Sequence, residues 1–495
     1  MRAHEYALDD DIVAIATALS PAALGIVRTS GSSSIERVAS FFSRAQALMR
    51  ARAHTFLHGW ILDGKTRVDE VVLLVYRAPH SFTGEHAVEI ICHGGVRTVQ
   101  AVYRLCLAQG FRAAQRGEFS FRSFFHGKRD LTRIEAIQSL VDARTCAAQQ
   151  QAVLHLSGAL QQEIAALTRA LLAFSATLQG EIEYPEDEET RVHDVDMREL
   201  EPLVERLRRL RACWQERALQ RTGVRIVLGG CPNAGKSSLF NALLGQDRAI
   251  VSSVPGTTRD WLEADLDLSG IPVRLCDTAG LRVTDNPIEA QGVVRSEQLL
   301  QGADCVFYII NGRAGVQAAD CAFLSDCAVP LVVVVTHHDL MSMSERTQVC
   351  QAVQSFVSAP VLSCARSQDE RGAGEQCLAG GKNEEVRDRA PRAFVCVSAK
   401  THAGLDALRA QTLHLLHGGQ VPYEELSLGS ERQYVLVDAA VQALEHAQEA
   451  YARGFGLDAV VHDLEEALYH CGALTGEVHS EDILDALFEK LCVGK

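Results

Sequence analysis

A glycine-rich segment that ends in a lysine and a serine is the first candidate for chemistry in this sequence. The pattern G-x-x-x-x-G-K-S occupies residues 230–237, between a strand-like run at 224–228 and a helical stretch that begins near Lys236. In this setting, backbone N–H groups and the helix N-terminus surround the β-phosphate of a nucleotide, Lys236 neutralises the β- and γ-phosphate oxygens, and Ser237 is a magnesium ligand. The residues expected to contact the nucleotide here are Asn233, Ala234, Gly235, Lys236, Ser237 and Ser238.

Two further motifs follow in the order that a GTPase requires. The segment VPGTTRD at 254–260 offers consecutive hydroxyl groups, of which Thr258 is the predicted second magnesium ligand. The segment D-T-A-G at 277–280 follows the next strand, so Asp277 would hold magnesium through water and the Gly280 N–H would bond the γ-phosphate. The nucleotide contacts predicted from these two motifs are Thr257, Thr258, Asp277, Thr278, Ala279 and Gly280.

The segment that should recognise the base departs from the usual N-K-x-D, because T-H-H-D stands at 336–339 after a strand-like run. Asp339 is kept, and its carboxylate can accept the N1–H and the N2 amine of guanine, which adenine lacks. The missing Asn and Lys normally tie this loop to the phosphate loop and stack on the base, which predicts weaker affinity, although His337 could cover the ring. The predicted contacts in this region are Thr336, Asp339, Ser398, Ala399 and Lys400.

The residues that would activate water are less evident. Many Ras-like proteins place Gln directly after D-x-x-G, whereas this chain has Leu281, which cannot orient water. Asn233 could hold a monovalent cation against the phosphates, and Glu289 could position the attacking water. From residue type alone, Glu289 is one of several acidic candidates, and an ordinary surface glutamate is the simpler interpretation. A metal site at His337 and its neighbour is disfavoured, because adjacent ligands point apart and no third ligand is evident.

The periodicity of apolar residues indicates which elements position these motifs. Strand-like runs alternate with helical stretches over about 11–125, helical spacing dominates about 131–220, and β-branched runs return over about 224–415 before a helical end. This predicts an α/β and α multidomain fold in which a Ras-like phosphate-loop domain is inserted between two helical segments that pack together. The expected bounds are 1–126 for an N-terminal α/β domain, 127–222 and 417–495 for the helical domain, and 223–416 for the GTPase domain with an added loop at 363–391.

Composition excludes several classes of protein. The net charge of −15 argues against a general electrostatic grip on nucleic acid, and the acidic run at 181–189 is best explained as a solvated segment. The 15 cysteines are scattered and contain no C-x-x-C pair, which favours a reduced cytoplasmic location. The most apolar runs, at 305–310 and 328–335, are shorter than the roughly 18 residues that span a bilayer and are expected to be buried strands. The acidic N-terminus is not typical of an export signal.

Seven segments together resemble one family over nearly the whole chain. They are GIVRTSG, SFTGEHAVEIICHGG, RGEFSFRSFFHGKRDLTRIEAI, CPNAGKSSL, PGTTRD, DTAGLR and the terminal LCVGK, in family order. The sequence resembles the MnmE (TrmE) family of tRNA-modification GTPases, within the TrmE-Era-EngA-like group.

The resemblance implies site residues and cofactors. It implies an N-terminal domain that binds a tetrahydrofolate derivative, in the 5-formyl or 5,10-methylene form, and forms a homodimer, and a GTPase domain that uses GTP, Mg²⁺ and K⁺. The folate residues by position are Arg28, Glu85, Lys128 and Lys495, and the potassium residues are Asn233, Ser252, Val254 and Thr257, with Ser252 also near the nucleotide. Glu289 matches the catalytic glutamate, which acts beside Lys236 and Gly280, and this outweighs the simpler interpretation. Cys492 matches a cysteine needed for modification, although a buried structural thiol fits it equally well.

The resemblance also implies partners. Family members act with the FAD-dependent protein MnmG, as a heterotetramer, to install a 5-carboxymethylaminomethyl or aminomethyl group on the wobble uridine of certain tRNAs. An alternative is a ribosome-assembly or regulatory GTPase that binds rRNA. Such proteins usually carry a basic RNA-binding domain, whereas this chain carries the folate-like N-terminal block and an acidic balance of charge. A folate enzyme with an unused GTPase domain fits poorly with a complete set of magnesium residues.

Overall fold

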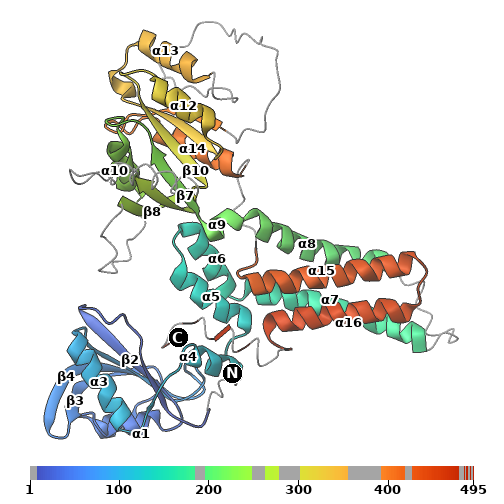
Figure 1. Ribbon diagram of the computed structural model, residues 1–495. Coiled ribbons are helices and arrows are strands. Elements are labelled where there is room, and N and C mark those ends of the chain that lie inside the picture. The colour runs from blue at the N-terminus through green and yellow to red at the C-terminus, as the bar shows by residue number, and fades with distance from the viewer. Residues whose placement is uncertain are drawn as a thin grey trace, which may run out of the picture. The chain divides into compact units, whose positions relative to one another are not determined.

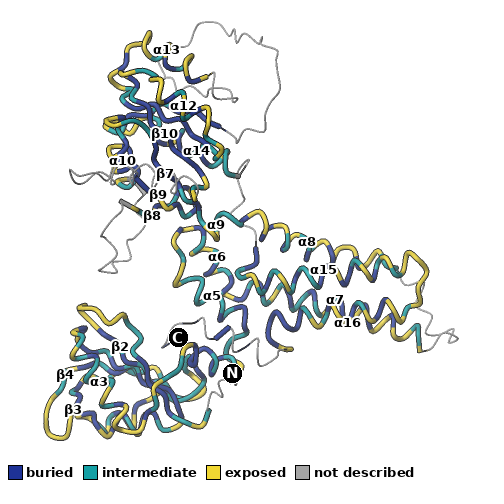
Figure 2. The backbone as a smooth tube through the Cα atoms, in the orientation of Figure 1, coloured by how far each residue is buried: buried dark blue, intermediate teal, exposed yellow. Residues whose placement is uncertain are grey.

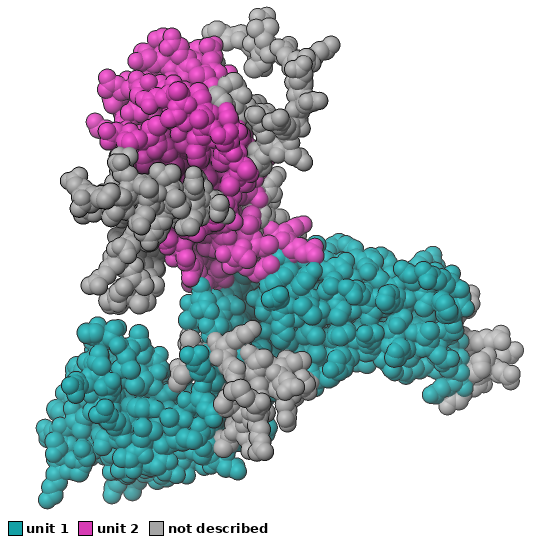
Figure 3. Space-filling view, viewed as in Figure 1, with its two compact units in different colours: residues 1–142, 151–214, 426–495 teal, residues 143–150, 215–425 magenta. Residues whose placement is uncertain are grey.

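A computed structural model describes residues 8–183, 196–247, 262–277, 302–354, 392–417 and 426–478, together with 484, 487, 488, 491 and 494. The chain forms two compact units (Figure 3). Unit 1 contains residues 1–142, 151–214 and 426–495, and unit 2 contains 143–150 and 215–425. No helix among the described residues is long and apolar enough to cross a membrane. The predicted mixed α/β and α fold is confirmed, whereas the domain bounds stay a prediction.

The N-terminal part of unit 1 is a six-stranded sheet in the order β3-β4-β5-β2-β1-β6 (Figure 1). Its strands are β1 (Ile12–Ile15), β2 (Leu24–Ser30), β3 (Thr55–Asp63), β4 (Thr66–Tyr76), β5 (Ala87–His93) and β6 (Arg112–Ala113). Its helices are α1 (Ser34–Ala39), α2 (Ala45–Arg50) and α3 (Val96–Ala108). On β4, Val71, Leu73 and Val75 are buried in the core that these helices share, whereas Val72 and Leu74 on the other face are half-buried. The sheet is antiparallel except for its β1–β6 pair, and this alternation is what a sheet covered on one face requires.

The rest of unit 1 is helical. Its described helices are α4 (Glu118–Phe125), α5 (Leu131–Asp142), α6 (Cys146–Leu156), α7 (Ala159–Glu183), η1 (Met197–Glu199), α8 (Glu201–Glu216), α15 (Glu431–Ala452) and α16 (Leu457–Thr475). One hydrophobic core joins α7, α8, α15 and α16, as the buried inner faces in Figure 2 show. The Ser430 side chain accepts a hydrogen bond from the Gln433 N–H at the start of α15, and Gly476 ends α16 in the left-handed conformation.

The last part of the predicted helical end, residues 479–495, lies mostly outside the described residues. Its described members Leu484, Leu487 and Phe488 are helical and pack against Leu131 and Ile134 of α5.

Unit 2 holds a six-stranded sheet in the order β12-β11-β10-β7-β9-β8, in which only the β8–β9 pair is antiparallel among the described strands. Its strands are β7 (Val224–Gly229), β8 (Leu262–Leu268), β9 (Ile271–Asp277), β10 (Cys305–Asn311), β11 (Leu331–Thr336) and β12 (Arg392–Cys396). The described helices are α9 (Ala218–Thr222), α10 (Lys236–Asp247), α12 (Ala318–Asp326), η3 (His338–Leu340), α13 (Met343–Gln354) and α14 (Leu405–His417). Helices on both faces explain why β10 and β11 are apolar along almost their whole length.

One predicted strand begins later than expected. The apolar run at 328–335 predicts strand throughout, but β11 begins at Leu331. Pro330 precedes it and has no N–H to donate to a neighbouring strand, so regular pairing starts only after it. The predicted surface loop at 363–391 lies outside the described residues.

Candidate functional site

The phosphate loop of unit 2 connects the end of β7 to the start of α10. Gly230 and Gly235 both have positive φ angles, of 132° and 98°. A Cβ atom at Gly230 would lie 2.2 Å from the carbonyl oxygen of Ile309, so only glycine fits beside β10 at this point. The loop therefore keeps its backbone close to the sheet and leads directly into the helix N-terminus.

Two polar side chains at the start of α10 lie where the sequence predicts them. The Lys236 ammonium group donates hydrogen bonds to the carbonyl oxygens of Gly230 and Cys231, both at 2.8 Å, and its side chain is buried. The Ser237 hydroxyl donates to the Asp277 carboxylate at 3.2 Å. Asp277 ends β9 and is also buried. A hydroxyl and a carboxylate in contact are suitable oxygen ligands for magnesium, so these residues fit the predicted ion.

The base-recognition loop remains attached to the phosphate loop. Thr336 ends β11 and is buried, and its hydroxyl donates to the carbonyl oxygen of Ala234 at 2.6 Å. The two loops are therefore connected despite the loss of the usual Asn. The weaker guanine affinity that was inferred from that loss stays a prediction.

Asp339 and the segment that begins at Ser398 also lie together. Asp339 belongs to η3, and a hydrogen bond with the Ser398 side chain holds the pKa of the Asp339 carboxyl below its ordinary value. At neutral pH the group is therefore a carboxylate with only acceptor oxygens, as guanine recognition requires. Ser398 is buried, and Ala399 and Lys400 follow it in the same turn.

Ten predicted residues lie outside the described part of the chain: Ser252, Val254, Thr257, Thr258, Thr278, Ala279, Gly280, Glu289, Cys492 and Lys495. Asn233, the one described member of the predicted potassium set, has a φ angle of 61°. The carbonyl oxygen of Asn233 accepts a hydrogen bond from the Asn311 amide at 3.4 Å. Ser238 is exposed at the start of α10.

Sequence reasoning missed a buried acid that supports the phosphate loop. Asp320 of α12 accepts hydrogen bonds from the Tyr308 hydroxyl at 2.9 Å and from the Cys231 thiol at 3.3 Å. Burial raises the pKa of the Tyr308 hydroxyl and also that of the Cys231 thiol, so both groups keep their protons and act as donors. Asp320 and Cys231 lie 89 residues apart in the sequence, so no local sequence pattern predicts their contact.

A second candidate site lies in the N-terminal sheet of unit 1. A cavity of about 290 Å³ is lined by Arg28, Thr29, Tyr76, Phe82, Thr83, Ala87, Glu89 and Phe119. The Arg28 guanidinium pairs with the Glu89 carboxylate at 2.7 Å and donates to the carbonyl oxygen of Gly494 at 3.0 Å. It also lies 5.8 Å from the ring centres of Phe82 and Phe119. The cavity therefore combines flat apolar walls with one cation and one carboxylate.

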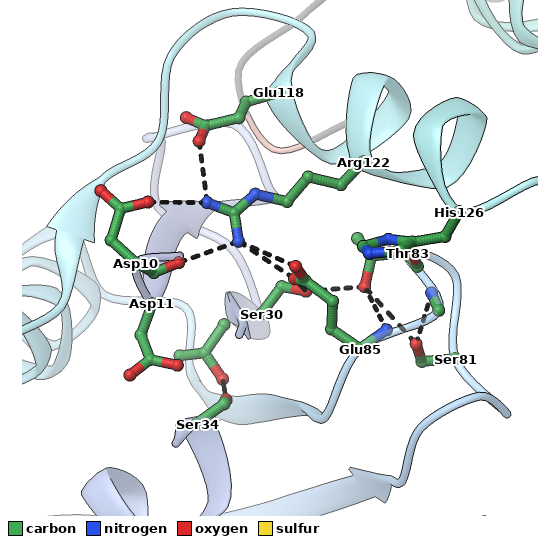
Figure 4. A network of polar contacts seen from close by, with 12 residues as sticks. Asp10, Asp11, Ser30, Ser34, Ser81, Thr83, Glu85, Glu118, Arg122 and His126 are labelled. Carbon is green, nitrogen blue, oxygen red and sulfur yellow. Dashed lines mark hydrogen bonds and ion pairs between the residues drawn. The ribbon is translucent and has the colours of Figure 1, made fainter. Parts of the chain in front are cut away.

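Glu85 belongs to a polar network beside this cavity (Figure 4). Its carboxylate accepts hydrogen bonds from Ser30 at 2.6 Å and from Arg122 at 3.1 Å. Arg122 is fully buried and also pairs with Asp10 and Glu118. Glu85 is not among the residues that line the cavity, whereas Glu89, which was not predicted from the sequence, is.

Lys128 follows α4 and is half-buried, and its backbone N–H donates to the carbonyl oxygen of Ser123 at 2.9 Å. Of the four predicted folate residues, the structure thus places Arg28 at the cavity and Glu85 in the network beside it. The period-two pattern of β5 could have indicated Glu89, because it shares the half-buried face of the sheet with Ile91.

Comparisons with known proteins match both parts of the chain that hold these sites. A family model described as "MnmE helical domain" matches residues 131–492, and one described as "GTP-binding protein TrmE N-terminus" matches residues 11–128. The chain is 98% identical over 495 residues to the tRNA modification GTPase MnmE of Treponema pallidum (strain Nichols), with 100% of both chains covered. It is 41% identical to the protein of the same name from Treponema denticola, again with 100% of both covered, and 37% identical to that of Synechococcus sp. (strain JA-3-3Ab), with 99% of both covered.

Proposed function

Since this chain belongs to the MnmE family of tRNA modification GTPases, we propose that its GTP hydrolysis depends on potassium and serves the modification of wobble uridines. The reaction would be carried out in the cytoplasm with MnmG, as a heterotetramer, and would place a 5-carboxymethylaminomethyl or aminomethyl group on certain tRNAs. The observation that carries the GTPase part is the hydrogen bond between Ser237 and Asp277 beside the phosphate loop. The same loop is bonded to the segment that holds Asp339 through the Thr336 hydroxyl.

Each residue of the nucleotide site has a proposed role in hydrolysis. Lys236 neutralises the β- and γ-phosphate oxygens. Ser237 and Thr258 would hold magnesium, and the bound ion would offset the charge that develops on the phosphates. The Gly280 N–H bonds the γ-phosphate, and Glu289 orients the attacking water.

The potassium proposal rests on the phosphate loop. Asn233 is exposed there with a left-handed backbone, and its carbonyl group is held by Asn311, which leaves the side-chain amide oxygen to serve as a cation ligand. A monovalent cation at this point would supply the positive charge that an arginine finger supplies elsewhere. The other proposed ligands are Ser252, Val254 and Thr257. Equal rates of hydrolysis in sodium and in potassium would contradict this part of the proposal.

The function is tested by mass analysis of wobble-uridine nucleosides in cells that lack the protein. We expect the modified nucleosides to disappear, to return with the wild-type gene, and to stay absent with Glu289→Ala. In purified protein, the same variant should retain nucleotide binding and lose about 100-fold in kcat, because water positioning contributes on that order.

The matched control for that test is Glu36→Ala, which removes an exposed glutamate from α1 and should restore modification. Unchanged nucleosides in the deletion, together with a defect in ribosomal subunits, would instead favour the alternative of a GTPase that binds rRNA.

The N-terminal cavity fits a folate derivative in its donor set. The Arg28 guanidinium can pair with a carboxylate of the glutamate tail, and the rings of Phe82 and Phe119 can cover a flat heterocycle. Glu85, in the network beside the cavity, is proposed to accept from a guanine-like pterin ring in addition to Ser30 and Arg122, and Lys128 and Lys495 are the further proposed contacts.

Replacing Arg28 with alanine is expected to weaken binding of 5-formyltetrahydrofolate by about 10- to 100-fold, because a charge-assisted hydrogen bond is lost. Isothermal titration calorimetry on the full chain measures this change. Arg104→Ala, which changes an exposed arginine of α3, is the control and should bind as the wild type does. Unchanged affinity in the Arg28 variant would remove this residue from the proposed site.

The face of the same sheet that α1, α2 and α3 leave uncovered, among the residues that the structure describes, supports the proposed homodimer. This open sheet face consists of Ile26, Val72, Leu74 and Ile91, which are half-buried, and Phe56, which is 72% exposed. In the sheet register Leu74 lies between Phe56 and Glu89, so the apolar face continues to the edge of the cavity. A contiguous apolar surface of this kind is typical of an interface between subunits.

Leu74→Glu is expected to convert the dimer into monomers at micromolar concentration, because it places a charge in the centre of the open sheet face. Sedimentation equilibrium measures the mass. Leu107→Glu puts the same charge on α3, on the other side of the sheet, and should remain dimeric. A Leu74 variant that sediments as the wild type does would place the interface elsewhere.

A further inference from the structure

The hydroxyl group of Thr336 lies at the point where the base-recognition loop meets the phosphate loop. Three acceptors are within its reach: the carbonyl oxygens of Ala234 at 2.6 Å and Ile310 at 3.2 Å, and Nδ1 of His337 at 3.1 Å. A hydroxyl has one proton to donate, and the shortest contact assigns that proton to Ala234. His337 can then donate to the hydroxyl oxygen of Thr336 when its Nδ1 carries a proton.

The surroundings make this contact costly to lose. Thr336 and Ala234 are each only 2% exposed, so water cannot replace a missing donor at the carbonyl oxygen of Ala234. The next residue, Gly235, has little free space, because a Cβ atom added there would lie 3.4 Å from the Thr336 methyl group and 3.5 Å from Cε1 of His337. The threonine methyl and the imidazole therefore pack against the loop that the hydroxyl bonds.

The same residue is connected to Asp339 through a short stretch of chain with a defined shape. His337 has a φ angle of 59°, in the left-handed region, so the backbone turns sharply directly after Thr336. The His338 N–H donates to the carbonyl oxygen of Val397, and the Arg346 guanidinium donates to the His338 carbonyl oxygen. The distance between the phosphate loop and the Asp339 carboxylate is thus fixed at one end by the Thr336 hydroxyl.

We propose that Thr336 is a positioning residue for guanine, which holds the Asp339 loop against the phosphate loop so that base and phosphates are gripped at one fixed separation. The proposal rests on the GTPase site described above and deepens it. In this chain a hydroxyl bound to a loop carbonyl does what the Asn of N-K-x-D does elsewhere. The geometry therefore predicts that the unusual T-H-H-D segment is compatible with full guanine selectivity.

The test compares GDP with IDP, which lacks the 2-amino group from which Asp339 would accept a hydrogen bond. Thr336→Val nearly keeps the side-chain volume and removes the hydroxyl group, which donates to Ala234 and can accept from His337. We expect its affinity for GDP to fall about tenfold, which is the effect of leaving one buried acceptor without a partner, and its preference for GDP over IDP to fall several-fold. Thr336→Ser keeps the hydroxyl and should recover most of both quantities.

The ratio of the two affinities separates positioning from a general loss of stability. A variant that is merely less stable binds both nucleotides less well by the same factor, so its GDP preference stays unchanged. Thr347→Val is the matched control, because it makes the same substitution at an exposed position of α13. The proposal is overturned if Thr336→Val keeps the wild-type preference, or if Thr336→Ser loses as much as Thr336→Val. A wild-type protein that binds neither nucleotide would instead contradict the GTPase assignment itself.

Discussion

Lys236→Ala is expected to lower kcat/KM for GTP by at least about 1,000-fold. The Lys236 ammonium group provides the positive charge of the phosphate loop, as far as the structure describes this loop, and it acts in a site shielded from water. Its side chain is 8% exposed and is held by the carbonyl oxygens of Gly230 and Cys231, which direct it along the loop. A phosphate chain that enters the loop would compete for the same ammonium group. The variant should therefore lose both binding and turnover.

Phosphate release across a range of GTP concentrations, measured in potassium buffer, checks this expectation. Lys65→Ala, in the exposed turn between β3 and β4, removes a lysine far from the nucleotide in sequence and should leave the rate unchanged. A Lys236 variant that keeps more than a tenth of the wild-type kcat/KM would show that the loop does not grip the phosphates as described.

Asp339→Asn is expected to change the preferred base from guanine to xanthine. The Asp339 carboxylate offers two acceptor oxygens, and the Ser398 hydrogen bond holds the pKa of this carboxyl below its ordinary value. Asparagine instead presents one acceptor and one donor, which matches xanthine, where a carbonyl replaces the 2-amine. We expect affinity for GDP to fall about 100-fold or more, and affinity for XDP to rise above it, because a mismatch of donors and acceptors in a base-specific site has effects of this size.

Competition of GDP and XDP for a fluorescent nucleotide measures the switch. Asp326→Asn, at the exposed end of α12, is the control and should keep the guanine preference. If the Asp339 variant still preferred GDP, the carboxylate would have no part in base selection, and the role of the Ser398 contact would have to be reconsidered as well.

The nucleotide site could be predicted from sequence where its residues are close together along the chain. The loop from Gly230 to Ser237 needs a strand, two glycines and a helix start, and all of these are local patterns. The contact between the Thr336 hydroxyl and Ala234 could not be predicted, because it joins residues 102 positions apart through a bond that any serine or threonine could make. The contact of Asp320 with Cys231 of the phosphate loop could not be predicted for the same reason.

The N-terminal site illustrates a different limit. Only the resemblance to the family points to Arg28, Glu85 and Lys128, since isolated charged residues are usually solvated. The structure adds Glu89 as the partner of Arg28, and Arg122 as the buried cation that holds Glu85. Burial of Arg122 depends on the packing of α4 against the sheet, and no periodicity within a single helix reveals which arginine becomes fully enclosed.

The shared core of α7, α8, α15 and α16 has a consequence for synthesis on the ribosome. The ion pair between Arg211 of α8 and Asp438 of α15 joins residues 227 positions apart, with the GTPase segment made in between. At about 5–20 residues per second, α7 and α8 wait roughly 10–45 s for the helices that complete their core. During that interval their apolar stripes, including Leu167 and Leu207, are open to chaperones, so a nascent chain stalled before residue 431 should be a preferred client of ribosome-bound holdases.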